Sequence, residues 1–343
     1  MECRAGAPYT ETADLRVEAV SNCLITGGAG LIGRALAREL SARGWRVTVL
    51  DDLSGHGHWP ELPADVERVE RDVRDVSALR AVCTRVRPRL LFHLAAVVGV
   101  RRVLRDPKGV HAGSLAGVEA CLSALEQACP HDTRLVFASS SEVYADQPGL
   151  LDESSALRTQ CEGRWAYAAA KLEGERRVLQ ANPLARVVRF FNVVGPGQSS
   201  EAGMVLPRFV ERARAGLPLE LYGDGSAQRC YAHVDEVARV LAELAAHPRW
   251  QEPVLNVGGK ASASARALAQ CVLRHSGSPS VLMPLDPERL LGGQFAEVRQ
   301  RTPDLGCLQR MGIALPVLDL DAIVLDMLAR HPRVEAQACA SPA

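Results

Sequence analysis

The feature of this sequence that most constrains its fold is an alternation of short apolar runs with amphipathic segments between residues 21 and about 195. The apolar runs have the length and composition of strands, and they include NCLIT at 22–26, RVTVLD at 46–51 and RLVFAS at 134–139. The segments between them have helical spacing. Strands that are apolar along their whole length are typical of a parallel sheet covered by helices on both faces. The pattern therefore predicts an α/β fold with a doubly wound parallel sheet.

The chain changes character after about Gly195. Glycine, proline and charged residues become more frequent, and shorter helical segments follow at 234–247, 265–276 and 320–331. We expect a smaller C-terminal substrate-binding region over the edge of the sheet where its strands end, since ligands bind there in such folds. The expected organisation is a flexible tail at 1–19, a cofactor domain at 20–195, a mainly substrate-binding domain at 196–330 and a second flexible tail at 331–343.

Composition excludes several classes of function. Forty basic residues balance forty acidic ones, so no overall field favours nucleic acid or a membrane surface. The first twenty residues contain no apolar core of a secretory signal, and no run of 18 apolar residues occurs. Ten scattered cysteines include no CxxC pair, which predicts buried thiols and no metal site. These observations predict a cytoplasmic protein.

A glycine-rich turn lies between the first expected strand and the first expected helix, in LITGGAGLIGRAL. Gly27, Gly28, Gly30 and Gly33 provide the tight turn and close backbone approach that a dinucleotide diphosphate at a helix N-terminus needs. Asp51 ends the second strand, where a carboxylate accepts hydrogen bonds from ribose hydroxyls and repels a 2′-phosphate. The turn therefore predicts a Rossmann-type domain that binds NAD in preference to NADP.

Tyr167 and Lys171 stand four residues apart on an expected helix and so share one face. An ammonium group near a phenol favours the phenolate, which predicts a lowered pKa for Tyr167 and a base for a sugar hydroxyl. The serine hydroxyls of SSSEVY, at 139–144, follow a buried strand and complete a candidate catalytic set with Tyr167 and Lys171.

The order of these motifs resembles a known family. TGGAGLIG at 26–33, HLAA at 93–96, SSSEVY, YAAAK at 167–171 and RFFNVVGPG at 189–197 are similar to motifs of the extended short-chain dehydrogenase/reductases that act on nucleotide sugars. The resemblance covers about residues 21–330, with two departures: the usual Asn-x-x-Gly is here Ser114-Leu-Ala-Gly117, and the usual Val-Tyr-Gly is here Val143-Tyr144-Ala145.

The resemblance implies a role for individual residues. NAD would contact Gly27, Gly30, Leu31, Ile32, Asp51, Asp72, Val73, Leu94, Ala95, Ala96, Tyr167 and Lys171. A UDP-sugar would contact Ser141, Asn192, Val205, Arg208, Tyr222, Arg229 and Arg301. Ser140 would bind the sugar 4-hydroxyl, Tyr167 would be the base and Lys171 would assist it. Two helices rich in small residues, at 110–129 and 166–181, would form the interface of a homodimer.

In enzymes of this family, NAD first oxidises the sugar at C4 to a ketone. Glu142 bears on which reaction follows that oxidation. A plain 4-epimerase needs only Ser140, Tyr167 and Lys171, whereas dehydratases and decarboxylases of the family carry a carboxylate two positions after the catalytic hydroxyl. The hydroxyl-Ser-Glu sequence at 140–142 resembles the UDP-glucuronate decarboxylases, and GDP-mannose dehydratases share it. Arg301, in RQRTPDL, stands where those decarboxylases carry an arginine.

The resemblance therefore implies an NAD-dependent UDP-glucuronate decarboxylase that makes UDP-xylose, with some release of the 4-keto pentose. Its catalytic residues would be Ser140, Glu142, Tyr167, Lys171 and Arg301. A nucleotide-sugar 4-epimerase for UDP-glucose or UDP-glucuronate is the alternative. A non-catalytic NAD-binding sensor is a third hypothesis, and the intact Tyr167 and Lys171 pair argues against it.

Overall fold

The computed structural model describes residues 21–55, 57–97, 99–129, 133–200, 203–248, 250–286 and 298–332. Within them, seven parallel strands form the main sheet, in the order β11-β7-β5-β4-β1-β2-β3. The strands are β1 (Asn22–Thr26), β2 (Arg46–Asp51), β3 (Glu67–Glu70), β4 (Leu90–His93), β5 (Arg134–Ser140), β7 (Arg186–Phe190) and β11 (Val254–Val257). The chain order reverses between β1 and β4, which is where such sheets bind ligands. The predicted α/β fold is confirmed.

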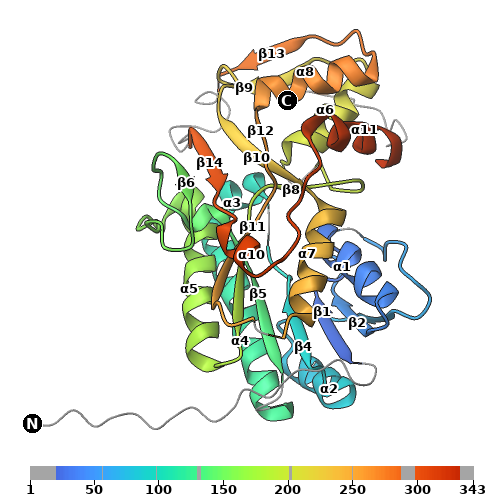
Figure 1. The fold of residues 1–343 in the computed structure, drawn as a ribbon, viewed down its shortest axis with the longest axis vertical. Coiled ribbons are helices and arrows are strands. Elements are labelled where there is room, and N and C mark those ends of the chain that lie inside the picture. Colours follow the sequence, from blue (N-terminus) through green and yellow to red (C-terminus); the bar gives the residue numbers. More distant parts are fainter. Residues whose placement is uncertain are drawn as a thin grey trace, which may run out of the picture.

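Helices cover both faces of the sheet (Figure 1). One face carries α1 (Leu31–Ala42) and α7 (Val234–Ala246). The other carries α2 (Val76–Val86), α4 (Pro107–Ala128) and α5 (Ala166–Ala181). Because successive strand residues point to opposite faces, Cys23 and Ile25 of β1 pack under α1 while Leu24 packs under α2. This double burial is why the strands read as apolar along their length.

The predicted helix ends have local causes. Gly44, expected to close the first helix, follows the last turn of α1 with a φ of 82°, a conformation that costs glycine little. Asp75 caps α2 by accepting a hydrogen bond from the Ala78 N–H at 3.0 Å. A short helix α3 (Val100–Arg105) precedes α4, whose first turn is capped by Asp106.

A second unit lies above the sheet in Figure 1. Its strands are β6 (Leu150–Leu151), β8 (Val193–Val194), β9 (Leu219–Tyr222), β10 (Gln228–His233), β12 (Ala261–Ser264), β13 (Leu282–Leu285) and β14 (Gln300–Pro303). Its helices α6 (Val205–Arg214), α8 (Ala265–Ser276) and α11 (Leu320–Arg330) share one apolar core. A short helix, α10 (Gly306–Arg310), packs instead on the apolar core between the main sheet and helices α1 and α7.

The two units are not divided at residue 195 of the chain. Strand β11 pairs with β7 in the main sheet, and α7 packs on α1, although both elements lie within 196–330. The expected boundary needs correction here, because the chain returns to the first unit to cover its sheet. The assignment of the remaining segment to substrate binding stays a prediction.

The two expected tails fall mostly on residues 1–20 and 333–343, outside the described part of the chain. His331, which we placed in the second tail, is buried and accepts a hydrogen bond from the Gly197 N–H at 3.2 Å. Among the helices that the structure describes, none is long and apolar enough to cross a membrane.

Candidate active site

The turn between β1 and α1 has the backbone that the glycine pattern predicts. Gly27 has a φ of 74°, and a Cβ atom on it would lie 2.6 Å from the Ala95 backbone nitrogen. A Cβ atom on Gly33 would collide with the Gly27 carbonyl oxygen. The protein's own packing therefore requires glycine at both positions.

Gly30 differs from these two glycines. Among the described residues, a Cβ atom at Gly30 would meet only the Gly27 oxygen, at 3.2 Å. Gly30 is also the N-cap of α1, so it offers no side-chain acceptor to the N–H groups of the first turn, which contains no acid. Such N–H groups at the positive end of a helix bind phosphate. The turn fits a dinucleotide diphosphate.

Asp51 faces this turn from the end of β2. Its Oδ2 accepts a hydrogen bond from the Ala29 N–H at 3.0 Å, and its Oδ1 accepts one from the Leu53 N–H at 2.9 Å. These bonds hold the carboxylate beside the glycine turn, where the sequence predicts contact with the ribose.

The other predicted cofactor residues lie around the same end of the sheet. Leu31 and Ile32 begin α1, Leu94, Ala95 and Ala96 follow β4, and Asp72 and Val73 follow β3. The Asp72 carboxylate is paired with Arg74 at 2.5 Å, which lowers the pKa of Asp72. An adenine contact by Asp72 stays a prediction.

The segment after β5 brings three predicted catalytic side chains together. Ser140 caps a short 3-10 helix, η1 (Ser141–Val143), and its Oγ accepts a hydrogen bond from the Glu142 N–H at 3.2 Å. The side chain of Ser140 is also hydrogen-bonded to that of Tyr167, near the start of α5. The charge of Glu142 acts on the same phenol. The structure thus brings Ser140, Tyr167 and Glu142 together, and their catalytic roles stay predictions.

The predicted effect of Lys171 on Tyr167 is wrong for the chain alone. Desolvation, and then the charge of Glu142, raise the pKa of Tyr167 above its ordinary value, and the Ser140 hydrogen bond offsets this only in part. Lys171 Nζ lies 5.7 Å from the Tyr167 ring centroid and donates to the Ala138 oxygen at 2.6 Å. Tyr167 therefore needs further positive charge to act as a base near neutral pH.

Arginines from several segments gather around Glu142. Arg301 Nη1, on β14, lies 3.9 Å from Glu142 Oε1, and Arg229 of β10 is the register partner of Arg301. The charge of Glu142 also acts on Arg158 and Arg164. Burial, with repulsion from these neighbours, lowers the pKa of Arg301 to about 10. The guanidinium groups of Arg158, Arg164 and Arg301 therefore interact with the Glu142 carboxylate from different segments of the chain.

Arg158 and Arg164 were not anticipated from the sequence. Their guanidinium carbons lie 3.5 Å and 4.1 Å from the ring centroid of Trp165, in a cation–π arrangement. Arg158 also donates to the carbonyl oxygens of Glu142, at 3.4 Å, and Tyr144, at 3.0 Å. The available signal was the pair Arg164-Trp165 directly before the Tyr167 motif.

A buried ion pair between Arg189 and Glu175 holds strand β5 against helix α5, which carries Tyr167. Arg189 of β7 donates Nε to Glu175 Oε1 at 3.0 Å and Nη2 to Glu175 Oε2 at 2.7 Å. The side chains are only 4% and 6% exposed. Ser139 donates its hydroxyl to the same carboxylate at 2.5 Å. Since Glu175 is one turn after Lys171 on α5, the pair fixes the end of β5 against the helix that carries Tyr167.

The predicted substrate residues occupy both units. Asn192 has a φ of 24°, and its buried Nδ2 has no hydrogen-bond partner among the described residues. A substrate contact by Asn192 stays a prediction. Arg208, one turn into α6 after Val205, is paired with Glu220 and donates to the Tyr222 hydroxyl at 3.2 Å. Ser141 is buried at the start of η1.

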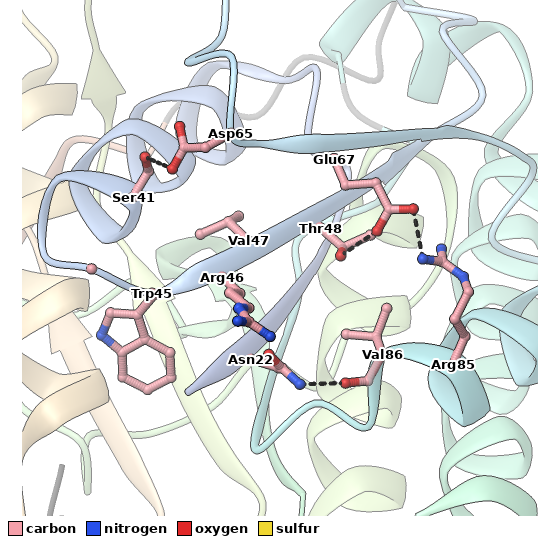
Figure 2. Close-up of a pocket in the computed structure, with 11 residues that line it drawn as sticks. Asn22, Ser41, Trp45, Arg46, Val47, Thr48, Asp65, Glu67, Arg85 and Val86 are labelled. Carbon is pink, nitrogen blue, oxygen red and sulfur yellow. Dashed lines mark hydrogen bonds and ion pairs between the residues drawn. The ribbon is translucent and has the colours of Figure 1, made fainter. Parts of the chain in front are cut away.

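A cleft of about 600 Å³ lies at the opposite end of the sheet, around the first residues of β1 and β2 (Figure 2). Its polar walls are largely paired with one another: Ser41 with Asp65 at 2.8 Å, and Thr48 with Glu67 at 2.9 Å. None of the predicted catalytic residues lines it.

Comparison with known proteins gives consistent matches. The model of the NAD dependent epimerase/dehydratase family matches residues 23–258. A UDP-N-acetyl-alpha-D-glucosaminuronate decarboxylase from Bacillus cytotoxicus is 32% identical over 301 residues, which cover 84% of this chain and 91% of that protein. A UDP-glucose 4-epimerase from Mycolicibacterium smegmatis is 31% identical over 268 residues, which cover 75% and 83%.

Among solved structures, the UDP-glucose 4-epimerase of Thermus thermophilus in complex with NAD superimposes with a TM-score of 0.78. It is 27% identical, and the match covers 90% of this chain and 98% of that one. The likeness therefore extends over both units of the fold.

Proposed function

This chain belongs to the NAD dependent epimerase/dehydratase family, and with NAD as its cofactor we propose that it decarboxylates a UDP-hexuronate, converting UDP-glucuronate to UDP-xylose. The observation that carries the proposal is the pair of Arg301 and Glu142, whose Nη1 and Oε1 atoms lie 3.9 Å apart, with Arg158 and Arg164 within reach of the Glu142 charge. A sugar carboxylate at C6 would pair with the buried Arg301 guanidinium. The relative from Bacillus cytotoxicus, a UDP-N-acetyl-alpha-D-glucosaminuronate decarboxylase by name, supports decarboxylation of a UDP-linked sugar uronate.

The residues of the chain have separable tasks in this reaction. Bound NAD supplies the hydride acceptor and a positively charged ring. Tyr167 takes the proton of the sugar 4-hydroxyl, and Ser140 holds that hydroxyl through the hydrogen-bonded pair that it forms with Tyr167. Lys171 adds a positive charge behind the phenol.

A ketone at C4 makes the C6 carboxylate a β-keto acid. The C5–C6 bond then breaks with release of carbon dioxide, and its electron pair moves onto the C4 oxygen as an enolate. Arg301 pairs with the carboxylate before it leaves, and Glu142 relays to C5 a proton that it takes up from solvent. Tyr167 gives its proton back to the C4 oxygen when the pentose forms. Bound NAD would supply the hydride for C4 and would so be regenerated in each cycle.

A 4-epimerase is the second candidate, because Ser140, Tyr167 and Lys171 suffice for it and the relative from Mycolicibacterium smegmatis is one by name. The test is to incubate the protein with NAD and, in turn, UDP-glucuronate, UDP-N-acetylglucosaminuronate and UDP-glucose, and to read the products by mass spectrometry. Loss of one carbon dioxide from a uronate is the expected result. An isomer of unchanged mass as the sole product supports the epimerase and overturns the decarboxylase.

A variant sharpens this test. Glu142→Gln should slow carbon dioxide release about 10²-fold to 10⁴-fold, the range for loss of a general acid or base. Asp146→Asn, at an exposed acid four residues further on, is the matched control and should retain full activity. An epimerase would keep its turnover of UDP-glucose in both variants.

A further inference from the structure

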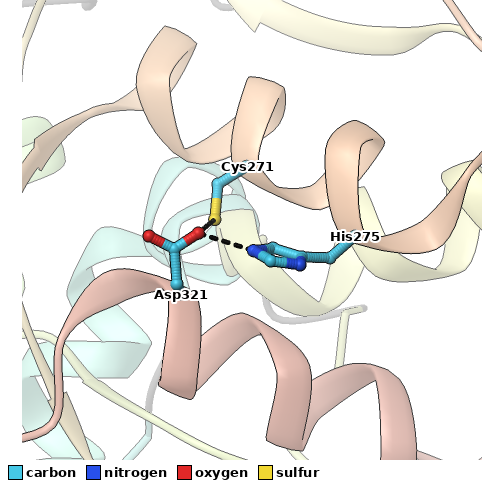
Figure 3. A group of neighbouring side chains, drawn as sticks. All are labelled: Cys271, His275 and Asp321. Atoms are coloured by element: carbon cyan, nitrogen blue, oxygen red, sulfur yellow. Dashed lines mark hydrogen bonds and ion pairs between the residues drawn. The ribbon is translucent and has the colours of Figure 1, made fainter.

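Three side chains that ligate metals meet on the second unit, away from the candidate active site (Figure 3). Cys271 and His275 stand four residues apart on α8, and Asp321 lies in the first turn of α11. One ligand atom from each residue lies within 4.8 Å of the other two. Asp321 Oδ1 lies 3.4 Å from Cys271 Sγ and 2.5 Å from His275 Nε2.

These separations are close to those of a tetrahedral metal site. Around a zinc ion with sulfur at about 2.3 Å and nitrogen or oxygen at about 2.0 Å, neighbouring ligand atoms lie about 3.3–3.6 Å apart. The Cys271 to Asp321 separation already has this value, and the His275 to Asp321 separation must lengthen by about 1 Å. Residues four apart on a helix share one face, so α8 presents the thiol and the imidazole together.

The cluster is reached from solvent on one side. The Asp321 side chain is 51% exposed, whereas Cys271 is buried behind it. A set of one sulfur, one nitrogen and one oxygen suits zinc, and three protein ligands leave a fourth position for water. Burial and the Asp321 carboxylate raise the pKa of Cys271 to about 11, so the ion has to displace the thiol proton, as zinc does.

Arg274 takes the place of a cation in the metal-free chain. Its Nη2 lies 2.5 Å from Asp321 Oδ1 and 3.6 Å from Cys271 Sγ, and its side chain is 61% exposed. An exposed arginine can swing into water at little cost. We propose that Cys271, His275 and Asp321 bind one zinc ion that links α8 to α11, with Arg274 as the competing cation. The sequence predicts no such site, because Asp321 is 46 residues beyond His275 and only the fold joins them.

Cobalt(II) is the probe, because a thiolate ligand gives it a charge-transfer absorption band in the near ultraviolet. Tag-free, metal-free protein is titrated with cobalt and then with zinc, which displaces it. We expect one cobalt per chain with the thiolate band, loss of that band in Cys271→Ser, and at least tenfold weaker binding in His275→Gln. Arg274→Ala should bind several-fold more tightly, since it lacks the competing charge.

The matched control is Cys161→Ser, which removes an exposed thiol outside the cluster and should leave the titration unchanged. Thermal melting of each variant shows whether it is folded. If Cys271→Ser does not fold, the cobalt affinity of His275→Gln tests the site in its place. A thiolate band that survives loss of Cys271, or a cobalt affinity that His275→Gln leaves unchanged, overturns the site. So does the absence of saturable cobalt binding in both the wild type and Arg274→Ala.

Discussion

Arg301 Nη1 lies 3.9 Å from Glu142 Oε1, although the two residues are far apart along the chain. The separation is that of an ion pair without a direct hydrogen bond, so both groups keep hydrogen-bonding capacity for a third partner. Arg301 is held there by β14, which pairs with β10 and β6 over the end of the main sheet. The pairing of Arg301 with Glu142 therefore requires both units of the fold.

Arg301→Gln tests whether this pair serves the sugar carboxylate. We expect turnover of UDP-glucuronate to fall about 10²-fold to 10³-fold, the effect of removing a preorganised group that stabilises charge in the reaction. NAD affinity should be unchanged, because Arg301 is remote from the glycine turn in the fold. Arg299→Gln, at an exposed neighbour on the same segment, is the control. Equal activity of the two variants would remove Arg301 from the reaction.

Gly30→Ala separates cofactor binding from folding. The added methyl group would approach only the Gly27 oxygen, at 3.2 Å, so the melting temperature should change little. The same group would stand where the diphosphate approaches the helix, and NAD affinity should fall at least tenfold, as measured by calorimetry. Gly55→Ala, at a glycine outside the turn with open space around it and no positive φ, controls for the general effect of the substitution. Unaltered NAD binding by Gly30→Ala would contradict the assigned diphosphate site.

Lys171 should make stability depend on pH in a defined window. Burial lowers the pKa of Lys171 from 10.5 to about 8 in the folded chain. Between these values the unfolded chain binds more protons than the folded one, so this residue makes the free energy of unfolding rise with pH. We expect the melting temperature of the wild type to rise relative to that of Lys171→Met as the pH increases from about 8 to about 10. Parallel curves for the two proteins would show that Lys171 titrates normally.

Glu175→Gln should destabilise the chain through Arg189. Removing one partner of a buried ion pair leaves the other charge uncompensated and costs about 3–5 kcal/mol, measured by chemical denaturation. The double variant Glu175→Gln/Arg189→Met should recover part of this loss, because the stranded charge is gone. At the half-exposed pair of Glu173 and Arg177, 2.7 Å apart, Glu173→Gln should cost under about 1 kcal/mol. Additive losses in the double variant would exclude the coupling.

The sequence by itself determined the main sheet, the glycine turn and the Tyr167 and Lys171 helix. These features depend on local causes: strands that are apolar on both faces, glycines where a side chain would collide, and a spacing of four on one helix. Such causes leave a regular pattern along the chain. The choice of Glu142 and Arg301 as candidate catalytic residues came from resemblance to a family, and their contact at 3.9 Å came from the fold.

Only the tertiary structure decided what surrounds these residues. The return of α7 and β11 to the first unit, the arginines around Glu142 and the raised pKa of Tyr167 arise from contacts between distant segments. Charge and desolvation at a point depend on everything packed near it. A residue's spacing along the chain carries no record of those neighbours, so the electrostatics of the site became visible only once the chain was folded.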